Sequence, residues 1–158
     1  MTDPTRIVKP AFSVIGMEGS TDDGEGFIQR LWNEANVRYG EIAHLVKLNE
    51  DGLPAGYWGA MTDPSRAFAP WEDGLSKGLY LAGAEVRDEA QAPEGWTKWT
   101  VPGFEYLRVA AGDDPGGALA DVIAYMEAKG LELAGAIHDF MELREGMRGY
   151  LFVPIEKR

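Results

Sequence analysis

The sequence predicts an α+β fold of two tandem strand-helix-strand-strand units, related by a pseudo-twofold axis with a central ligand groove. The chain has 158 residues, of which 45% are hydrophobic and 26% charged, as in one folded domain. The same order of strand, helix, strand and strand occurs twice along it. A polar, proline-containing stretch at 88–95 (DEAQAPEG) separates the two occurrences. We therefore expect a single domain, 1–158, with one half at about 1–87 and the other at about 96–158.

The first half contains three expected strands and one helix. A strand is predicted at 6–17, where β-branched and aromatic residues precede glycines. A helix is predicted at 26–42, where apolar residues recur at intervals of three and four. Strands at 56–61 and 78–86 complete this half, with a proline-containing loop at 63–78 between them.

The second half repeats this order. The segment 96–112 is expected to form one long or bent strand, interrupted by a Pro-Gly pair. A helix is expected at 113–130, because aspartates and a proline begin the segment and a glycine ends it. Two final strands are expected at 135–143 and 149–157, joined by the charged turn 144–148.

The two halves can be compared position by position. Phe12 and Phe104 begin corresponding strands, and each strand is followed by paired aspartates and then a helix. One unit alone would leave a face of its sheet uncovered. Two such units can pair about a twofold axis, and the groove between them is where a ligand would bind.

Composition excludes several classes of function. Fifteen basic and 26 acidic residues give a net charge of −11, which repels phosphate backbones and attracts cations. We expect no direct nucleic acid binding. The sequence has no run of about 18 apolar residues and its first residues do not resemble a signal peptide, so we expect no membrane partner and a cytoplasmic location. The absence of cysteine and the presence of only two histidines argue against a metal site and a metal cofactor, and no phosphate-binding loop is present.

Five segments carry a resemblance to a known family. In order they are GYWGAMTDPS, LYLAGAEV, WTVPGFEYLRVAAGDD, GLELAGAIHDFMEL and the terminal YLFVPIEK. Together they resemble the GyrI-like effector-binding family, found alone and as the ligand-sensing module of AraC- and MerR-type regulators. The resemblance implies a central groove that binds hydrophobic, often cationic, small molecules. It also implies that some stand-alone members are hydrolases of reactive electrophiles. The chain begins almost at its first strand, so we expect no DNA-binding segment, and any regulatory role would need a protein partner; a homodimer is left open.

The resemblance places an acidic residue on the next-to-last strand. Asp139 aligns with the glutamate of the family, and Met141 aligns with its tyrosine, so the usual hydroxyl is missing. Side chains alternate along a strand, so Glu142 would face opposite to Asp139, on the side of His138 and Phe140. Only one of these two sets can face the groove, and the sequence does not decide between them.

The remaining candidates are aromatic. Ring faces can attract a cation and stack on a planar ligand, although the same residues can also pack a core. Trp32 is expected to pack in the core, whereas Trp71 and Phe68, in the loop between two strands, could cover the groove. The candidate ligand-binding residues are Trp58, Trp71, Tyr80, Phe104, Tyr106, His138, Asp139, Phe140 and Glu142.

The sequence therefore predicts a protein that binds hydrophobic, cationic aromatic small molecules for sensing or sequestration. The alternative is a hydrolase of electrophilic or strained-ring molecules, in which a groove carboxylate, Glu142 or Asp139, acts on water. A pure interaction module for a partner protein is a third interpretation.

Overall fold

The structure is a computed structural model that describes residues 4–143 and 147–158. Its centre is one eight-stranded sheet in which every neighbouring pair of strands is antiparallel, in the order β1-β6-β8-β7-β3-β4-β2-β5. The strands are β1 (Thr5–Lys9), β2 (Phe12–Ser20), β3 (Tyr57–Thr62), β4 (Leu79–Val86), β5 (Thr97–Val101), β6 (Phe104–Ala110), β7 (His138–Leu143) and β8 (Met147–Lys157). The helices are α1 (Phe27–Val37), α2 (Glu72–Leu75) and α3 (Pro115–Lys129), with short 3-10 turns at Thr21–Asp23, Tyr39–Glu41 and Ala43–Leu45. The turn expected at 144–148 lies largely outside the described residues.

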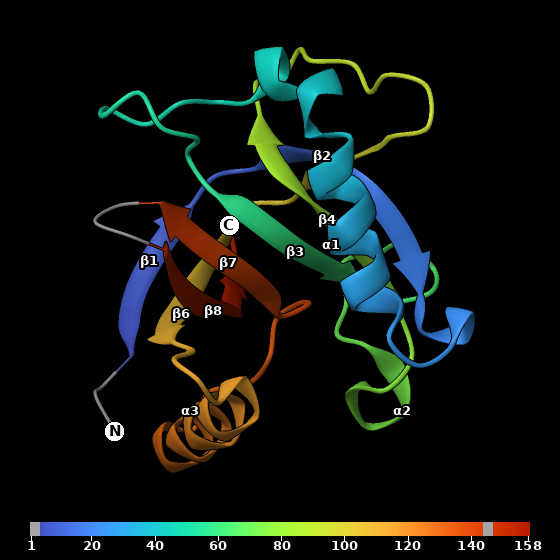
Figure 1. Cartoon of the computed structure of the whole chain (residues 1–158). Helices are drawn as coiled ribbons and strands as arrows, with labels where there is room; N and C mark the ends of the chain where they lie inside the picture. The colour runs from blue at the N-terminus through green and yellow to red at the C-terminus, as the bar shows by residue number, and fades with distance from the viewer. Residues whose placement is uncertain (1–3, 144–146) are drawn as a thin grey trace.

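The order of strands confirms the predicted fold class. The strands of the unit β2-α1-β3-β4 form one half of the strand order, and the strands of the unit β6-α3-β7-β8 form the other half. The order β6-β8-β7 in one unit corresponds to β2-β4-β3 in the other, so a pseudo-twofold axis passes between β3 and β7, the adjacent strands at the centre. Figure 1 shows these two strands running past each other in the middle of the molecule.

Two expected strands are each divided in two. The segment 6–17 forms β1 and β2, and the segment 96–112 contains β5 and β6. Pro10 and Pro102 lie at the breaks, where a residue without an N–H interrupts a ladder of hydrogen bonds. The leading strand of each unit pairs with the other unit, because β1 pairs with β6 and β5 pairs with β2. The three-stranded halves expected from the sequence are therefore joined in one sheet by the pairing of β3 with β7, and each half receives an outer edge strand from the other.

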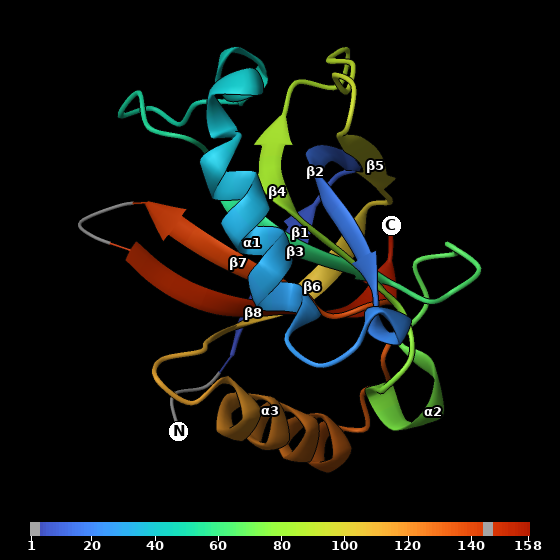
Figure 2. The ribbon, with the colours of Figure 1, turned by 45° about the vertical axis from the view of Figure 1, so that its right-hand side comes forward.

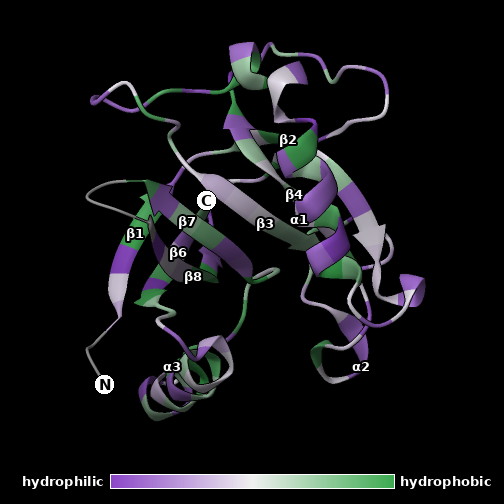
Figure 3. Ribbon diagram, in the orientation of Figure 1, coloured by the Kyte–Doolittle hydropathy of each residue, from purple (hydrophilic) through white to green (hydrophobic). Residues whose placement is uncertain are grey.

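Helices α1 and α3 cover the same face of the sheet. Residues directly opposite each other on neighbouring strands point to the same face. One such row crosses six strands, in the order Val109, Leu151, Asp139, Gly59, Ala82 and Met17. Met17 packs in the cluster that contains Ala35 of α1, and Leu151 packs in the cluster that contains Val122 of α3. Figure 2 shows α1 in front of the sheet and α3 below it, and Figure 3 shows hydrophobic and hydrophilic residues alternating along both helices.

The opposite face holds the aromatic core. Its buried residues come from both units, and the sheet coils so that they form one cluster. Trp58 lies at the centre, 1% exposed, with its ring centroid 4.7 Å from Phe12, 4.5 Å from Phe140 and 4.9 Å from Phe152. Burying large aromatic side chains is a main source of stability in a domain of this size. The groove between the helices and the aromatic core therefore lie on opposite sides of one sheet.

Candidate functional site

The site is built around Asp139, at the middle of the row that crosses the sheet. Asp139 is in β7, and its direct neighbour on β3 is Gly59. A Cβ added at Gly59 would lie 1.9 Å from the hydroxyl oxygen of Tyr80, so only a glycine lets the Tyr80 ring cross β3. The Tyr80 hydroxyl reaches across this position and donates a hydrogen bond to Asp139 Oδ2 at 3.1 Å.

Trp32 extends this contact to helix α1. Its indole Nε1–H donates to the Tyr80 hydroxyl oxygen at 3.0 Å. Burial and the Asp139 charge raise the pKa of Tyr80 well above its ordinary value, so the phenol stays protonated and can donate. Hydrogen bonds therefore run from Trp32 through Tyr80 to Asp139 and fix the carboxylate in the groove.

The Asp139 carboxyl is held in an apolar environment. Burial raises its pKa above the ordinary value, and the hydrogen bond from Tyr80 offsets part of this rise. Within the described part of the chain, Asp139 forms no ion pair. A buried charge without a counterion is costly, and this cost is the reason that burial raises the pKa of Asp139.

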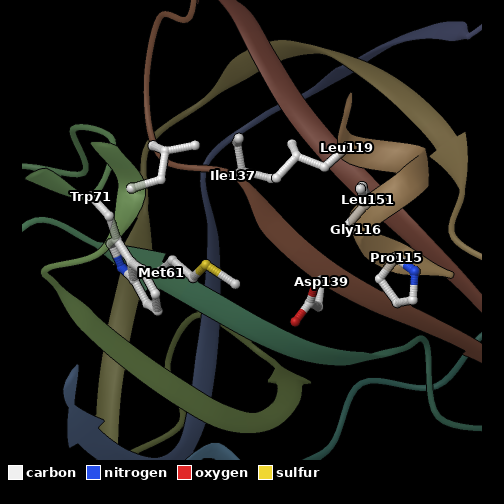
Figure 4. A pocket seen from close by; sticks show the side chains of 9 residues that line it. Met61, Trp71, Pro115, Gly116, Leu119, Ile137, Asp139 and Leu151 are labelled. Atoms are coloured by element: carbon white, nitrogen blue, oxygen red, sulfur yellow. The ribbon is translucent and has the colours of Figure 1, made fainter. Parts of the chain in front are cut away.

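One cavity lies between Asp139 and the loop that precedes β4. It has a volume of about 220 Å³, and Figure 4 shows the Asp139 carboxylate directed into it. Its side chains are mostly aliphatic, so we call it the aliphatic cavity. Its lining residues are Met61, Trp71, Leu75, Pro115, Gly116, Leu119, Ile137, Asp139 and Leu151.

Local hydrogen bonds position Trp71 at this cavity. The buried Asp63 carboxylate accepts from the backbone N–H groups of Ser65, Ala67 and Ala69. Burial opposes the charge, but the hydrogen bonds from Ser65 and the backbone outweigh it and lower the pKa of Asp63 to about 2. The loop is thus ordered around a permanent anion. Beyond it, Trp71 donates its indole N–H to the Leu79 carbonyl at 3.1 Å.

A second cavity lies on the other side of Asp139. It has a volume of about 270 Å³ and shares Asp139 and Pro115 with the aliphatic cavity. Aromatic and small residues line it, so we call it the aromatic cavity. Its lining residues are Trp32, Tyr57, Tyr80, Ala111, Gly112, Pro115, Asp139, Phe140, Met141, Gly149 and Tyr150.

The structure brings only part of the expected site together. Asp139, Tyr80 and Trp71 line the two cavities, and Phe140 lines the aromatic cavity while also packing on the core. Trp71 forms part of a cavity wall, whereas Phe68 packs in the core against Trp99, so the two do not form a lid together.

Four expected groove residues are instead in the aromatic core, which corrects their expected location. Trp58, Phe104, Tyr106 and His138 are at most 3% exposed, and none of them lines either cavity. They alternate with the groove-facing residues of their strands and so point to the opposite face. Burial lowers the pKa of His138 to about 3, and the neutral ring accepts the Met61 N–H at Nδ1, at 3.0 Å.

The register also decides between the two carboxylates that the sequence left open. Asp139 is in the groove row with Leu151, whereas Glu142 is three residues further along β7 and pairs in the sheet with Arg148. With alternating side chains, Glu142 faces the other side of the sheet, and neither cavity includes it. The groove candidate is therefore Asp139.

The fold is shared with solved structures of low sequence identity. SAV2435, solved bound to tetraphenylphosphonium, is 14% identical with a TM-score of 0.64, over 98% of this chain and 94% of that one. The C-terminal domain of EcmrR is 12% identical with a TM-score of 0.64, over 98% and 99%. A hydrolase from Listeria innocua is 14% identical with a TM-score of 0.51, over 98% and 92%. The chain has the GyrI-like fold. No family model matches the sequence, and no curated protein matches it.

Sequence reasoning missed several residues that line the groove of this GyrI-like fold. Trp32 was assigned to the core, although it bonds to Tyr80 and lines the aromatic cavity. Its position on the apolar face of α1 does not distinguish a core residue from a groove residue, because that face covers both the sheet and the groove. The aliphatic residues, such as Leu119 and Ile137, carry no chemical signal that separates a cavity wall from a core.

Residues 4–143 and 147–158 contain no group of three or more histidine, aspartate or glutamate side chains that could hold a metal ion. No helix within this part of the chain has the length and apolar character needed to cross a bilayer.

The bond from Tyr80 can be tested by Tyr80→Phe. This variant removes the hydrogen bond to Asp139 and leaves the Trp32 indole without its acceptor. We expect the pKa of Asp139 to rise further and the free energy of unfolding to fall by about 1–3 kcal/mol. The pKa can be followed by NMR titration and stability by urea unfolding. Tyr150→Phe, in the same cavity, is the control. Equal pKa values for Asp139 in the Tyr80→Phe variant and the wild type would contradict this arrangement.

Proposed function

We propose that the protein binds hydrophobic, cationic aromatic small molecules in the groove between α1 and α3, for sensing or sequestration. One observation carries the proposal: among the residues that the structure describes, Asp139 is the only acidic or basic one that lines the two cavities. A delocalised cation loses less hydration on burial than a compact ammonium group, and aromatic side chains add attraction to its charge. The tetraphenylphosphonium bound to SAV2435, which shares the fold, is a ligand of this class.

Charge selectivity tests the proposal directly. Tetraphenylphosphonium and tetraphenylborate have nearly the same size and shape and opposite charges. We expect isothermal titration calorimetry to detect the cation and to detect no binding of the borate. Equal affinities for the two ions would show that the groove selects only apolar surface, and the proposal would fail.

The pH dependence of binding follows from the raised pKa of Asp139. The ionised carboxylate is the form that binds a cation, so affinity is expected to be full at pH values above the pKa of Asp139 in the folded protein. It should fall as the pH drops through that pKa, with protons released on binding. His138, with a pKa of about 3, stays neutral above pH 5 and does not contribute. Titrations between pH 4 and pH 8 measure this effect, and Asp139→Asn should bind with no such dependence.

A hydrolase is the second candidate. A desolvated carboxylate that accepts a hydrogen bond from Tyr80 at Oδ2, at 3.1 Å, could take a proton from water at its other oxygen, and the attacking hydroxide would open an epoxide whose oxygen is then protonated to the alcohol. The hydrolase from Listeria innocua has the same fold. Incubation with aromatic epoxides, followed by mass spectrometry, tests this function. A diol product that disappears in Asp139→Asn would favour the enzyme over the binding protein.

A further inference from the structure

The two cavities differ in chemistry although they meet at the same carboxylate. Apart from Asp139, the described residues that line the aliphatic cavity offer no side-chain hydrogen-bond donor to a ligand, because their one indole N–H is bonded to a backbone carbonyl. A polar substituent placed there would lose its hydration without compensation. The aromatic cavity instead contains Tyr57, Tyr80 and Trp32, which offer aromatic rings.

The sizes of the cavities indicate that one ligand fills both. About 220 Å³ and about 270 Å³ are each below the range of roughly 300–1,000 Å³ that is usual for a ligand pocket. Both cavities include Asp139 and Pro115, so a ligand with its charge at Asp139 can extend to either side.

We propose, on the basis of the function proposed above, that the site is bipartite and selects asymmetric cations. The ligand class is a positive centre with a planar aromatic part in the aromatic cavity and a flexible aliphatic part in the aliphatic cavity. Aromatic ring faces recognise the planar part. The aliphatic part gains affinity through burial of apolar area, which has no directional requirement.

Two glycines offer matched ways to fill each cavity. Gly116 lines the aliphatic cavity, and the nearest atom to an added Cβ is an Asp114 carboxylate oxygen at 3.7 Å. Gly149 lines the aromatic cavity, and an added Cβ would lie 3.8 Å from Ala111 Cβ. Both distances are ordinary van der Waals contacts, and neither glycine has a positive φ. Leucine is favoured over glycine in a helix and in a strand, so both variants should fold.

The test uses 10-methyl and 10-nonyl derivatives of acridine orange, which share a planar cation and differ only in the aliphatic chain. For the wild type, we expect the nonyl compound to bind at least tenfold more tightly, measured by fluorescence titration. Gly116→Leu should remove this advantage while the affinity for the methyl compound changes less than twofold. Gly149→Leu should weaken both compounds at least tenfold. Gly116→Ala and Gly149→Ala are used if a leucine variant does not fold.

The outcomes separate the two proposals. The bipartite site is wrong, and the proposed function stands, if both compounds bind in a way that depends on Asp139 but the nonyl chain does not raise affinity. The same conclusion follows if both glycine variants weaken the binding of both compounds equally. If neither compound binds in a way that depends on Asp139, both proposals fail.

Discussion

Asp139→Asn is expected to weaken the binding of tetraphenylphosphonium by about 2–4 kcal/mol, at least thirtyfold in the dissociation constant. The amide keeps the size of the side chain and removes the one charge that the described residues place in the groove. Titration calorimetry at pH 7.5 measures the effect. Glu142→Gln is the matched control, because Glu142 is on the same strand and faces the other side of the sheet. Equal losses in the two variants would mean that the ligand does not bind where Asp139 points.

The same substitution should stabilise the protein without ligand. Because burial raises the pKa of Asp139, the protonated form favours the folded state. That contribution is full below the unfolded pKa and is lost as the pH rises through the folded pKa. At neutral pH, Asp139→Asn is therefore expected to raise the melting temperature, and the difference from wild type should vanish in acid. A carboxylate that lowers stability and raises affinity is the expected signature of a binding site.

Trp58→Ala is expected to lower the free energy of unfolding by about 3–5 kcal/mol, because it leaves a large cavity in the aromatic core. It also removes the hydrogen bond from the indole to Glu85 Oε1, at 3.1 Å. For a domain of this size the melting temperature should fall by about 6–20 °C. Calorimetry and urea unfolding measure the change.

The affinity of Trp58→Ala for tetraphenylphosphonium should stay close to that of the wild type at a temperature where the variant is folded. Trp71→Ala is the counterpart, because Trp71 lines the aliphatic cavity and should affect affinity more than stability. If Trp58→Ala has normal stability and loses affinity for the ligand, Trp58 belongs to the ligand site and not to the core.

Local patterns were enough to predict α1, α3 and most strands, whereas α2 lies in the segment 63–78 that was expected to be a loop. Apolar spacing predicted α1, and aspartates with a proline predicted the start of α3, where Asp114 accepts from the Gly117 N–H. The exchange of β1 and β5 could not be predicted, because it depends on pairing between segments that are 81 to 103 residues apart. Pro10 and Pro102 indicated where strands break, but not which neighbour each piece would pair with.

The candidate site was harder to predict because both faces of the sheet are covered. In β7 the sequence alternates between two sets, with His138 and Phe140 in one and Asp139 in the other. When helices cover one face and an aromatic core the other, hydrophobicity does not show which face holds the ligand. Only tertiary contacts fix which of the two sets faces the groove, above all the contact of Tyr80 across Gly59 with Asp139.

The exchanged edge strands limit how the groove can respond to a ligand. The connectors between β1 and β2 and between β5 and β6 touch, since a Cβ on Gly103 would lie 3.3 Å from the Ala11 nitrogen. A hinge motion that separates the two halves would have to break the pairing of both exchanged strands with their neighbours in the sheet. Under the proposed function, we expect a larger ligand to be accommodated by displacement of α1, α3 and the segment that carries Trp71. We expect occupancy of the groove to change the outer helices at the surface, while the sheet keeps its arrangement.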